Sequence, residues 1–175
     1  MTRRRALLLA LAAGLAGCGF RPMLRPGEEG VGEELAAVEV PSLTGRVGYL
    51  VRDSLLDQLN PTGAPVPHRY QLQVALRRRN SPLAIQLDNT VTRYNLTLVA
   101  RFSLLDSRSG QILYRATVRR IASYNAIRAP YAELAAELDA ERRAAREVGT
   151  DIRTQLAIHF ARAQEAAPAA PVAPS

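Results

Sequence analysis

The chain has 175 residues, of which 47% are hydrophobic and 22% are charged, and its formal net charge is +7. This length suits a single domain with a modest core, and with the composition it argues against a two-domain enzyme and against a largely disordered protein. All 23 basic residues are arginines, and the only cysteine, Cys18, excludes an intramolecular disulfide.

The first eighteen residues have the layout of a bacterial lipoprotein signal. Three arginines at residues 3–5 precede an 11-residue apolar run, Ala6 to Ala16, that is rich in leucine and alanine. As a helix this run would span about 16 Å, about half of a ~30 Å hydrocarbon core, so it is too short for a transmembrane anchor. It leads into Leu15-Ala16-Gly17-Cys18, which resembles a lipobox, the motif in which the peptide is cleaved before an acylated cysteine.

We therefore predict a lipoprotein signal peptide over residues 1–17 and lipidation of Cys18, whose acyl chains would hold the mature chain on a membrane. An ordinary secretory signal with a chance cysteine is the alternative. Gly19 follows the cysteine at a position where aspartate usually favours retention in the inner membrane, so the resemblance to a lipobox implies the outer membrane.

Both ends of the mature chain are predicted to be linkers. Residues 18–34 contain prolines, glycines and four glutamates without an apolar period, and we interpret them as a lipidated tether. Residues 166–175 hold three prolines among alanines and predict a disordered tail. Residues 35–165 remain as the folded domain.

The first half of this domain predicts a strand, a helix and a second strand. Leu35 to Val40 is a short strand that ends at Pro41, and Thr44 is the predicted N-cap of an amphipathic helix that ends before Asn60. From Tyr70 onward, apolar and polar residues alternate with the period of two that marks a sheet with one buried face.

The second half predicts two long antiparallel strands and a long helix. One strand starts near Leu83, and its apolar set changes from odd to even positions near Asp88-Asn89, which predicts a bulge or bend. A hairpin loop at residues 106–110 leads into a returning strand from Ile112. From Pro130 an apolar stripe through about 30 residues predicts the last helix. The stripe consists of Leu134, Leu138, Ala145, Val148, Ile152, Leu156 and Phe160.

The predicted element order is β-α-β-β-β-α. The most economical arrangement is an α+β domain, in which a four-stranded antiparallel or mixed sheet has two helices packed on one face.

Positive charge is concentrated on the predicted strands. Ten arginines and only two acids lie between Arg69 and Arg120, whereas acids outnumber arginines in the rest of the mature chain. Strand alternation places Arg77, Arg79, Arg93, Arg101, Arg115 and Arg119 on the face opposite the apolar residues. The candidate anion-binding patch consists of these six together with Arg78.

Three interpretations of the patch remain open. It is a solvated outer face whose arginines deter edge pairing, a nucleic-acid surface, or a site for a phosphorylated or carboxylated ligand, which guanidinium groups bind through paired hydrogen bonds. Nucleic acid is disfavoured because an exported lipoprotein does not meet it and because no aromatic residues interleave with the arginines. In the outer membrane the abundant anionic amphiphile is lipopolysaccharide.

Catalysis and metal binding find little support. His68 and His159 have no cysteine or acid at a spacing that would complete a ligand set, and no Gly-x-Ser-x-Gly motif occurs. We expect both histidines to be structural or exposed, and we expect no enzyme activity, no metal and no cofactor.

Several short motifs occur in a characteristic order along the chain. They are Cys18-Gly19-Phe20-Arg21-Pro22, Val40-Pro41, Gly45-Arg46, Tyr70-Gln71-Leu72, Ile85-Gln86-Leu87-Asp88, Thr92-Arg93-Tyr94-Asn95-Leu96 and Ser123-Tyr124-Asn125. In this order they resemble the LptE family of lipopolysaccharide-assembly lipoproteins, in its alphaproteobacterial branch. The resemblance covers residues 18–160, and the departures are the alanine- and proline-rich tail and the segment Met23-Leu24-Arg25.

The resemblance implies a plug inside the outer-membrane β-barrel LptD, which the protein helps to assemble and where it binds lipopolysaccharide on its way to the outer leaflet. The polar lumen of a large barrel would accept a sheet face of arginine, asparagine and threonine. The alternative is a periplasm-facing lipoprotein that binds another envelope partner or a small anionic ligand. A plug needs a barrel and no deep apolar pocket, whereas a ligand carrier needs a pocket of several hundred cubic ångströms.

Overall fold

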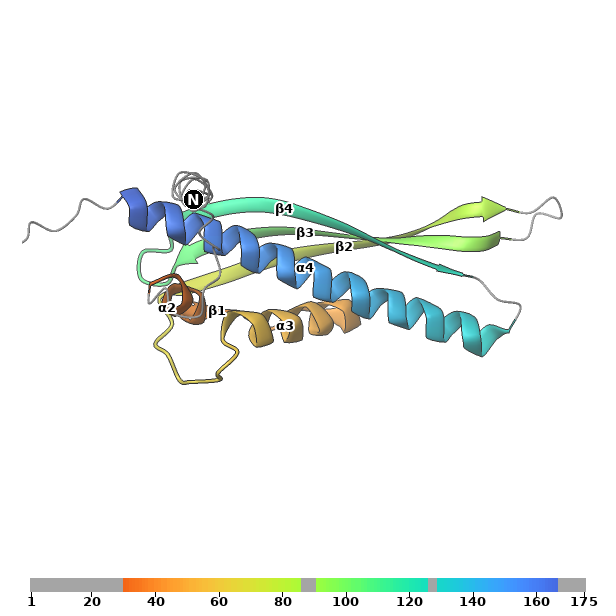
Figure 1. The fold of residues 1–175 in the computed structure, drawn as a ribbon, viewed down its shortest axis with the longest axis horizontal. Coiled ribbons are helices and arrows are strands. Elements are labelled where there is room, and N and C mark those ends of the chain that lie inside the picture. Colours follow the sequence, from red (N-terminus) through yellow and green to blue (C-terminus); the bar gives the residue numbers. More distant parts are fainter. Residues whose placement is uncertain (1–29, 86–90, 126–128, 167–175) are drawn as a thin grey trace, which may run out of the picture.

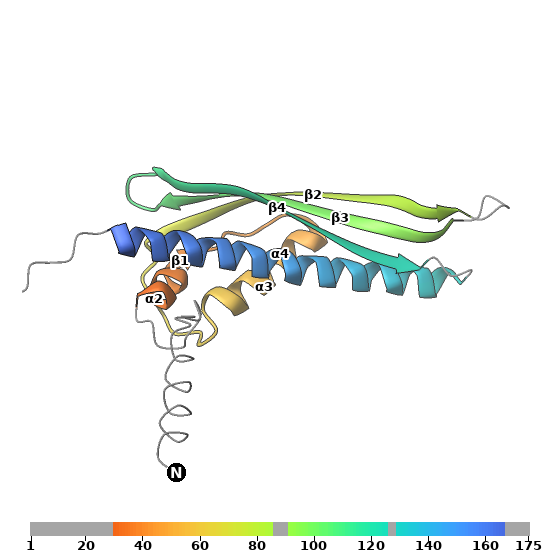
Figure 2. The same ribbon diagram turned by 45° about the horizontal axis from the view of Figure 1, so that its top comes forward.

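The computed structural model describes residues 30–85, 91–125 and 129–166. Its elements are, in chain order, α2 (Val31–Ala36), β1 (Val38–Glu39), α3 (Gly45–Leu59), β2 (Tyr70–Ile85), β3 (Val91–Asp106), β4 (Ile112–Asn125) and α4 (Pro130–Ala166). Within these residues the strands form one mixed sheet in the order β1-β2-β3-β4, and the helices lie on one of its faces (Figures 1 and 2). The predicted α+β class is confirmed, with α2 as an additional short helix.

The strand predicted from Leu35 to Val40 is much shorter than expected. Only Val38 and Glu39 form β1, and they pair in parallel with the first two residues of β2. The parallel pairing follows from the crossover through α3, which brings the chain back to the same end of the sheet. Leu35 still reaches the core, but it does so from the helix α2.

Helix α2 begins within the range that we interpreted as tether. Two glutamates, Glu33 and Glu34, lie in its first turn, where negative charge favours a helix N-terminus. The helix ends at Ala36, and the carbonyl of its C-cap residue Ala37 accepts the backbone amides of Arg69 at 3.0 Å and Tyr70 at 3.2 Å. Residues 18–29 of the predicted tether and residues 167–175 of the predicted tail lie outside the described residues.

Strands β2, β3 and β4 form two long antiparallel pairs. The pairing runs from Tyr70 opposite Asp106 to Ile85 opposite Val91, and from Arg93 opposite Asn125 toward the β3–β4 hairpin. The even positions of these strands face the helices and supply most of the buried residues of the sheet. These are Leu72, Leu96, Leu98, Ala100, Phe102, Leu104, Val118, Ala122 and Tyr124.

The prediction that a new strand starts near Leu83 is wrong, because this residue belongs to the end of β2. The register shifts between Pro82 and Ala84 and again before Ile85. Pro82 has no amide hydrogen to give to the ladder, which accounts for an irregularity at this point. The bulge predicted at Asp88-Asn89 lies outside the described residues.

The hairpin loop predicted at residues 106–110 is confirmed. The Asp106 carboxylate accepts the backbone amides of Arg108 at 3.1 Å and Ser109 at 2.7 Å, and Gly110 takes a positive φ of 69°. Hydrogen bonds from Ser109 lower the pKa of the Asp106 carboxyl, so the ionised form holds the loop.

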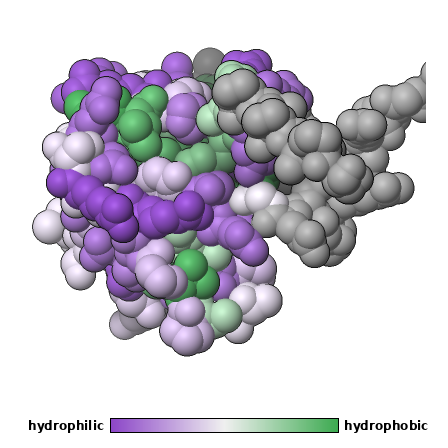
Figure 3. Space-filling model, turned by 90° about the vertical axis from the view of Figure 1, so that its left-hand side faces the viewer, coloured by the Kyte–Doolittle hydropathy of each residue, from purple (hydrophilic) through white to green (hydrophobic). Residues whose placement is uncertain are grey.

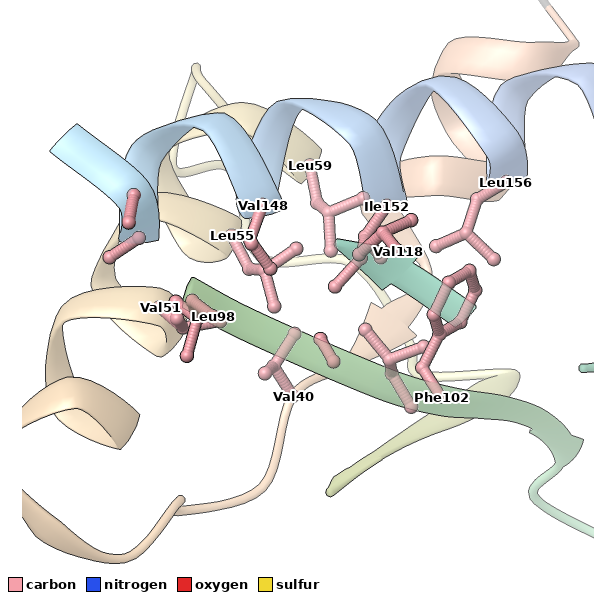
Figure 4. Close-up of a cluster of buried hydrophobic side chains, with 14 of the residues drawn as sticks. Val40, Val51, Leu55, Leu59, Leu98, Phe102, Val118, Val148, Ile152 and Leu156 are labelled. Carbon is pink, nitrogen blue, oxygen red and sulfur yellow. The ribbon is translucent and has the colours of Figure 1, made fainter. Parts of the chain in front are cut away.

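The hydrophobic core lies between the sheet and the helices α3 and α4. Figure 4 shows leucine and valine side chains of both helices converging on Leu98 and Phe102 of β3. Helix α3 follows its predicted N-cap Thr44 and buries Val51, Leu55 and Leu59. The predicted stripe of α4 is buried from Ala145 to Phe160, but its first member, Leu134, is 52% exposed because α4 extends beyond the core. No described helix is long and apolar enough to cross a membrane.

Helices α3 and α4 approach closely where Gly149 faces Ser54. A Cβ atom at position 149 would lie 2.5 Å from the Ser54 hydroxyl and 3.2 Å from its Cβ. The Ser54 hydroxyl is itself held by the Gln58 amide at 2.8 Å, so the small residue at 149 is required by packing.

We predict that Gly149→Leu lowers the free energy of unfolding by about 1–3 kcal/mol, because overpacking outweighs the gain in helix propensity. Gly32→Leu is the matched control, since a Cβ at Gly32 would meet nothing within 4 Å. Denaturant unfolding of both variants measures the difference, and equal stability would show that the two helices do not need this close contact.

Candidate functional site

The candidate site is the face of the sheet that points away from the helices, which no described element covers (Figure 2). The register places Arg77, Val99 and Arg119 in one row across β2, β3 and β4. In the next row Arg101 lies between Ala75 and Thr117. Arg101 is therefore a diagonal neighbour of Arg77, Arg115 and Arg119, with Cα atoms about 7–8 Å apart.

We call Arg77, Arg101, Arg115 and Arg119 the outer arginine cluster. All four side chains are exposed, and so are Arg79 and Arg93 farther along the same face. Among the described residues, none of these six arginines forms an ion pair with a carboxylate. The outward positions of β2, β3 and β4 in the described ranges also hold no aspartate or glutamate. Within the described part of the chain, the cluster is thus a cationic surface without a counter-charge.

An open depression of about 650 Å³ lies over the cluster. It is lined by residues of β2, β3 and β4 that include Gln73, Arg101, Ser103, Arg115 and Thr117. Two guanidinium groups beside hydroxyl and amide side chains can bind phosphate or carboxylate oxygens by paired, charge-assisted hydrogen bonds.

Arg78 does not share this face, although it stands between two residues that do. Its side chain points to the helices and forms ion pairs with Glu137 and, at 3.0 Å, with Glu141. Glu141 also accepts from the Nε of Arg46 at 3.0 Å, and its side chain is only 8% exposed. The structure therefore separates Arg78 from the other six arginines of the predicted patch, because neighbouring residues on a strand point to opposite faces.

Arg78 belongs to a polar network that joins β2 to α4. The Asn80 amide donates to Glu137 at 2.8 Å and to the Tyr124 hydroxyl at 3.2 Å. Burial raises the pKa of Tyr124, so its hydroxyl stays protonated. The network fixes the first turns of α4, which extend past the N-terminus of α3.

Neither histidine belongs to the outer arginine cluster. His159 stacks on Tyr114, with ring centroids 4.9 Å apart, and burial lowers the pKa of its imidazole. His68 is exposed in the connection between α3 and β2. The described part of the chain contains no group of three side chains that could hold a metal ion.

A second surface feature was not predicted from the sequence. A groove of about 760 Å³ lies at the end of the molecule where α2, the last turn of α3 and the connection to β2 meet α4. Its walls include Leu35, Leu59, Val66 and Pro67, and Arg153 of α4 reaches it. The walls come from distant parts of the chain, so no local sequence pattern predicts the groove. The one local signal is the set of prolines in the connection, which indicates a restricted backbone there.

The predicted lipidation site, Cys18, lies outside the described residues, so the structure gives no account of it.

One comparison with known proteins identifies a family. A family model described as LptE, lipopolysaccharide-assembly, matches residues 35–156. No curated protein matches the chain. Among solved structures, a "putative lipoprotein" from Caulobacter crescentus CB15 is 30% identical with a TM-score of 0.64, and the alignment covers 76% of this chain and 96% of that one.

Two further lipoproteins are similar in fold alone. A minor lipoprotein from Acinetobacter baumannii is 20% identical with a TM-score of 0.54, and the alignment covers 69% of this chain and 88% of that one. Lipoprotein B from Nitrosomonas europaea is 15% identical with a TM-score of 0.50, and the alignment covers 73% of this chain and 84% of that one.

We predict that Arg78→Ala lowers the free energy of unfolding by about 1–3 kcal/mol, because it removes a partner from the buried Glu141 carboxylate. Arg77→Ala, at the adjacent position on the outer face, should change it by less than about 0.5 kcal/mol. Equilibrium unfolding in urea compares the two. A loss of stability in Arg77→Ala equal to that in Arg78→Ala would contradict the assignment of the two side chains to different faces.

Proposed function

The chain belongs to the LptE family of lipopolysaccharide-assembly proteins, and from this membership we propose that it is an outer-membrane lipoprotein that plugs the LptD barrel and binds lipopolysaccharide there. The resemblance predicted from the sequence motifs is confirmed by the family match over residues 35–156. The family is a lipopolysaccharide-assembly family rather than an enzyme family, so the chain is a lipopolysaccharide-assembly lipoprotein.

The outer arginine cluster is the observation that carries the proposed binding of lipopolysaccharide. Its guanidinium groups are exposed and have no carboxylate partner among the described residues. Lipopolysaccharide presents phosphates, and arginine binds phosphate through two parallel hydrogen bonds. The strands hold the Cα atoms of these residues in fixed rows, so binding would need no ordering of the backbone.

The same face suits the interior of a β-barrel. Residues such as Asn95, Thr97 and Ser103 alternate with the arginines on the outward side of β3. The lumen of a large barrel is polar, so the arginine, asparagine, threonine and serine side chains of this surface could form hydrogen bonds there. These properties support the proposal that LptD is the partner.

The proposed anchor is Cys18, acylated after removal of residues 1–17. Residues 18–29 separate it from the first described residue, Gly30. Twelve residues span at most about 40 Å when extended, so the domain would remain close to the membrane surface. The proposed position at the outer membrane, facing the periplasm and entering the barrel lumen, rests on the family membership and on Gly19 after the cysteine.

One observation favours the second candidate, a periplasm-facing lipoprotein that binds a small anionic ligand or another envelope partner. The groove of about 760 Å³ has the size that a ligand carrier needs. A plug needs no such pocket. The two candidates are therefore distinguished by the partner that co-purifies with the protein.

Detergent extraction of the tagged, acylated protein tests the plug hypothesis. We predict that a β-barrel of LptD type co-purifies in a one-to-one complex that survives washing at high salt, because most of the contact is inside the barrel. Recovery of the lipoprotein alone, in amounts that match its total in the membrane, would contradict this function and leave the second candidate.

We predict that Arg101→Glu combined with Arg115→Glu weakens lipopolysaccharide binding at least about a hundredfold, which is the loss expected from two charge-assisted hydrogen bonds. Arg108→Glu combined with Arg162→Glu changes the net charge equally at exposed positions outside the cluster and should have little effect. Binding is measured with purified lipopolysaccharide, and circular dichroism checks the fold. Equal losses in both double variants would indicate a general charge effect.

We predict that Cys18→Ser yields a protein that incorporates no labelled palmitate and does not fractionate with the outer membrane. Normal labelling and normal outer-membrane fractionation of the variant would show that Cys18 is not the anchor. A Ser54→Ala variant, altered far from the signal, serves as the control for expression and export.

A further inference from the structure

The groove at the α2 end of the molecule has the composition of a site for an apolar ligand with one charged end. Its lining combines apolar residues, among them Leu35 of α2, Leu59 of α3 and Val66 and Pro67 of the following connection, with polar and charged ones. The polar and charged ones are Glu33, Gln58, Asn60, Thr62, Arg69 and Arg153. Figure 3 looks onto this end of the molecule and shows hydrophobic surface patches set among hydrophilic residues. A volume of about 760 Å³ lies within the usual range for small-molecule sites.

The wall formed by residues 60–69 has a defined conformation. The Asn60 amide donates to the Ala64 carbonyl at 2.8 Å, and the Thr62 hydroxyl donates to the Asn60 side chain at 3.0 Å. Gly63 has a positive φ of 63°, and the three prolines of this segment restrict the backbone further. Such a wall is formed before any ligand arrives, which lowers the entropy lost on binding.

Arg153 supplies a cation at the side of the groove. Its Nε donates to the Gln58 carbonyl at 3.1 Å, in the last turn of α3, and this bond orients the guanidinium group. Within the described residues, Arg153 forms no ion pair. The other arginine of the lining, Arg69, is paired with Glu34 at 2.9 Å, and Glu33 is exposed on α2. Arg153 is therefore the group best placed to receive a phosphate or carboxylate.

We propose that this groove binds an acyl chain of lipopolysaccharide, with Arg153 facing the phosphate-bearing end of the same molecule. The inference rests on the proposed function, which supplies an anionic amphiphile as ligand. The apolar walls fit the chain and the guanidinium fits the head group. Gly32 of the groove is 14 residues after the proposed anchor Cys18, so an extended tether would keep the groove within about 50 Å of the membrane surface.

Photo-crosslinking in the native bacterium tests the assignment with the full, acylated chain. The photoreactive residue p-benzoylphenylalanine replaces Val66 in the groove, Thr117 on the outer face or Tyr49, which is 64% exposed on α3 away from both surfaces. After irradiation, adducts are detected with an antibody to lipid A. We expect a lipopolysaccharide adduct from position 66 and none from position 49.

The outcomes separate the two proposals. An adduct from position 117 but none from 66 overturns the groove assignment and leaves the proposed function in place. No adduct from either position overturns both. An adduct between position 66 and another protein, or a crosslink from 66 to the chain's own tether, also overturns the groove assignment, because the groove would then have a different occupant.

Arg153→Glu should reduce the adduct from position 66 at least about fivefold, because it places a carboxylate where the head group is expected. Arg146→Glu, two helical turns earlier on α4 and outside the groove, makes the same charge change and should leave the yield unchanged. If Arg153→Glu does not accumulate, Arg153→Gln keeps a hydrogen-bond donor and removes the charge. An unchanged yield in the Arg153 variant overturns the role of this arginine.

Discussion

The alternation of side chains along β2, β3 and β4 is the constraint on which both faces of the sheet depend. In one register the leucines of β3 pack under α3 and α4 while Arg101 and its neighbours stay in solvent. A slip of one residue would exchange the two sets and bury guanidinium groups without partners, at a large cost in free energy. The closed loop at Asp106 to Gly110 helps to fix this register at one end of the β3–β4 pair.

The same alternation explains which parts of the structure could be predicted from the sequence. The polar face and the buried face follow directly from the period of two, and α3 and α4 follow from their apolar stripes. The run Arg77-Arg78-Arg79 must alternate as well, so Arg78 could have been assigned to the helix side from parity alone. Its partners Glu137 and Glu141 could not, because their pairing with β2 depends on how far α4 extends along the sheet.

The errors in the sequence prediction have local physical causes. Helix α2 has six residues, too few for a period to be visible, and it is stabilised by packing of Leu35 rather than by propensity. The sequence predicts a strand start near Leu83 because Leu83 and Ile85 are apolar at alternate positions, but both residues belong to the end of β2. No local sequence pattern predicts the groove, because its lining residues are distant in the chain. The Arg153 Nε, for example, donates to the Gln58 carbonyl at 3.1 Å across 95 residues.

The outer arginine cluster and the groove lie in different layers of the molecule, and this separation bears on how an amphiphile would be handled. The cluster occupies the sheet face without helices (Figure 2), whereas the groove is lined by residues of α2, α3, the connection to β2 and α4. Phosphate groups are bound by exposed hydrogen-bond donors, whereas acyl chains are bound by apolar surface that excludes water. One flat face could not provide both kinds of surface. If a barrel encloses the sheet face, the groove at the end of the helix layer stays accessible, and an acyl chain bound there would be shielded from water. The division of polar and apolar contacts between the two layers follows from the strand register, since it turns the arginines away from the helices.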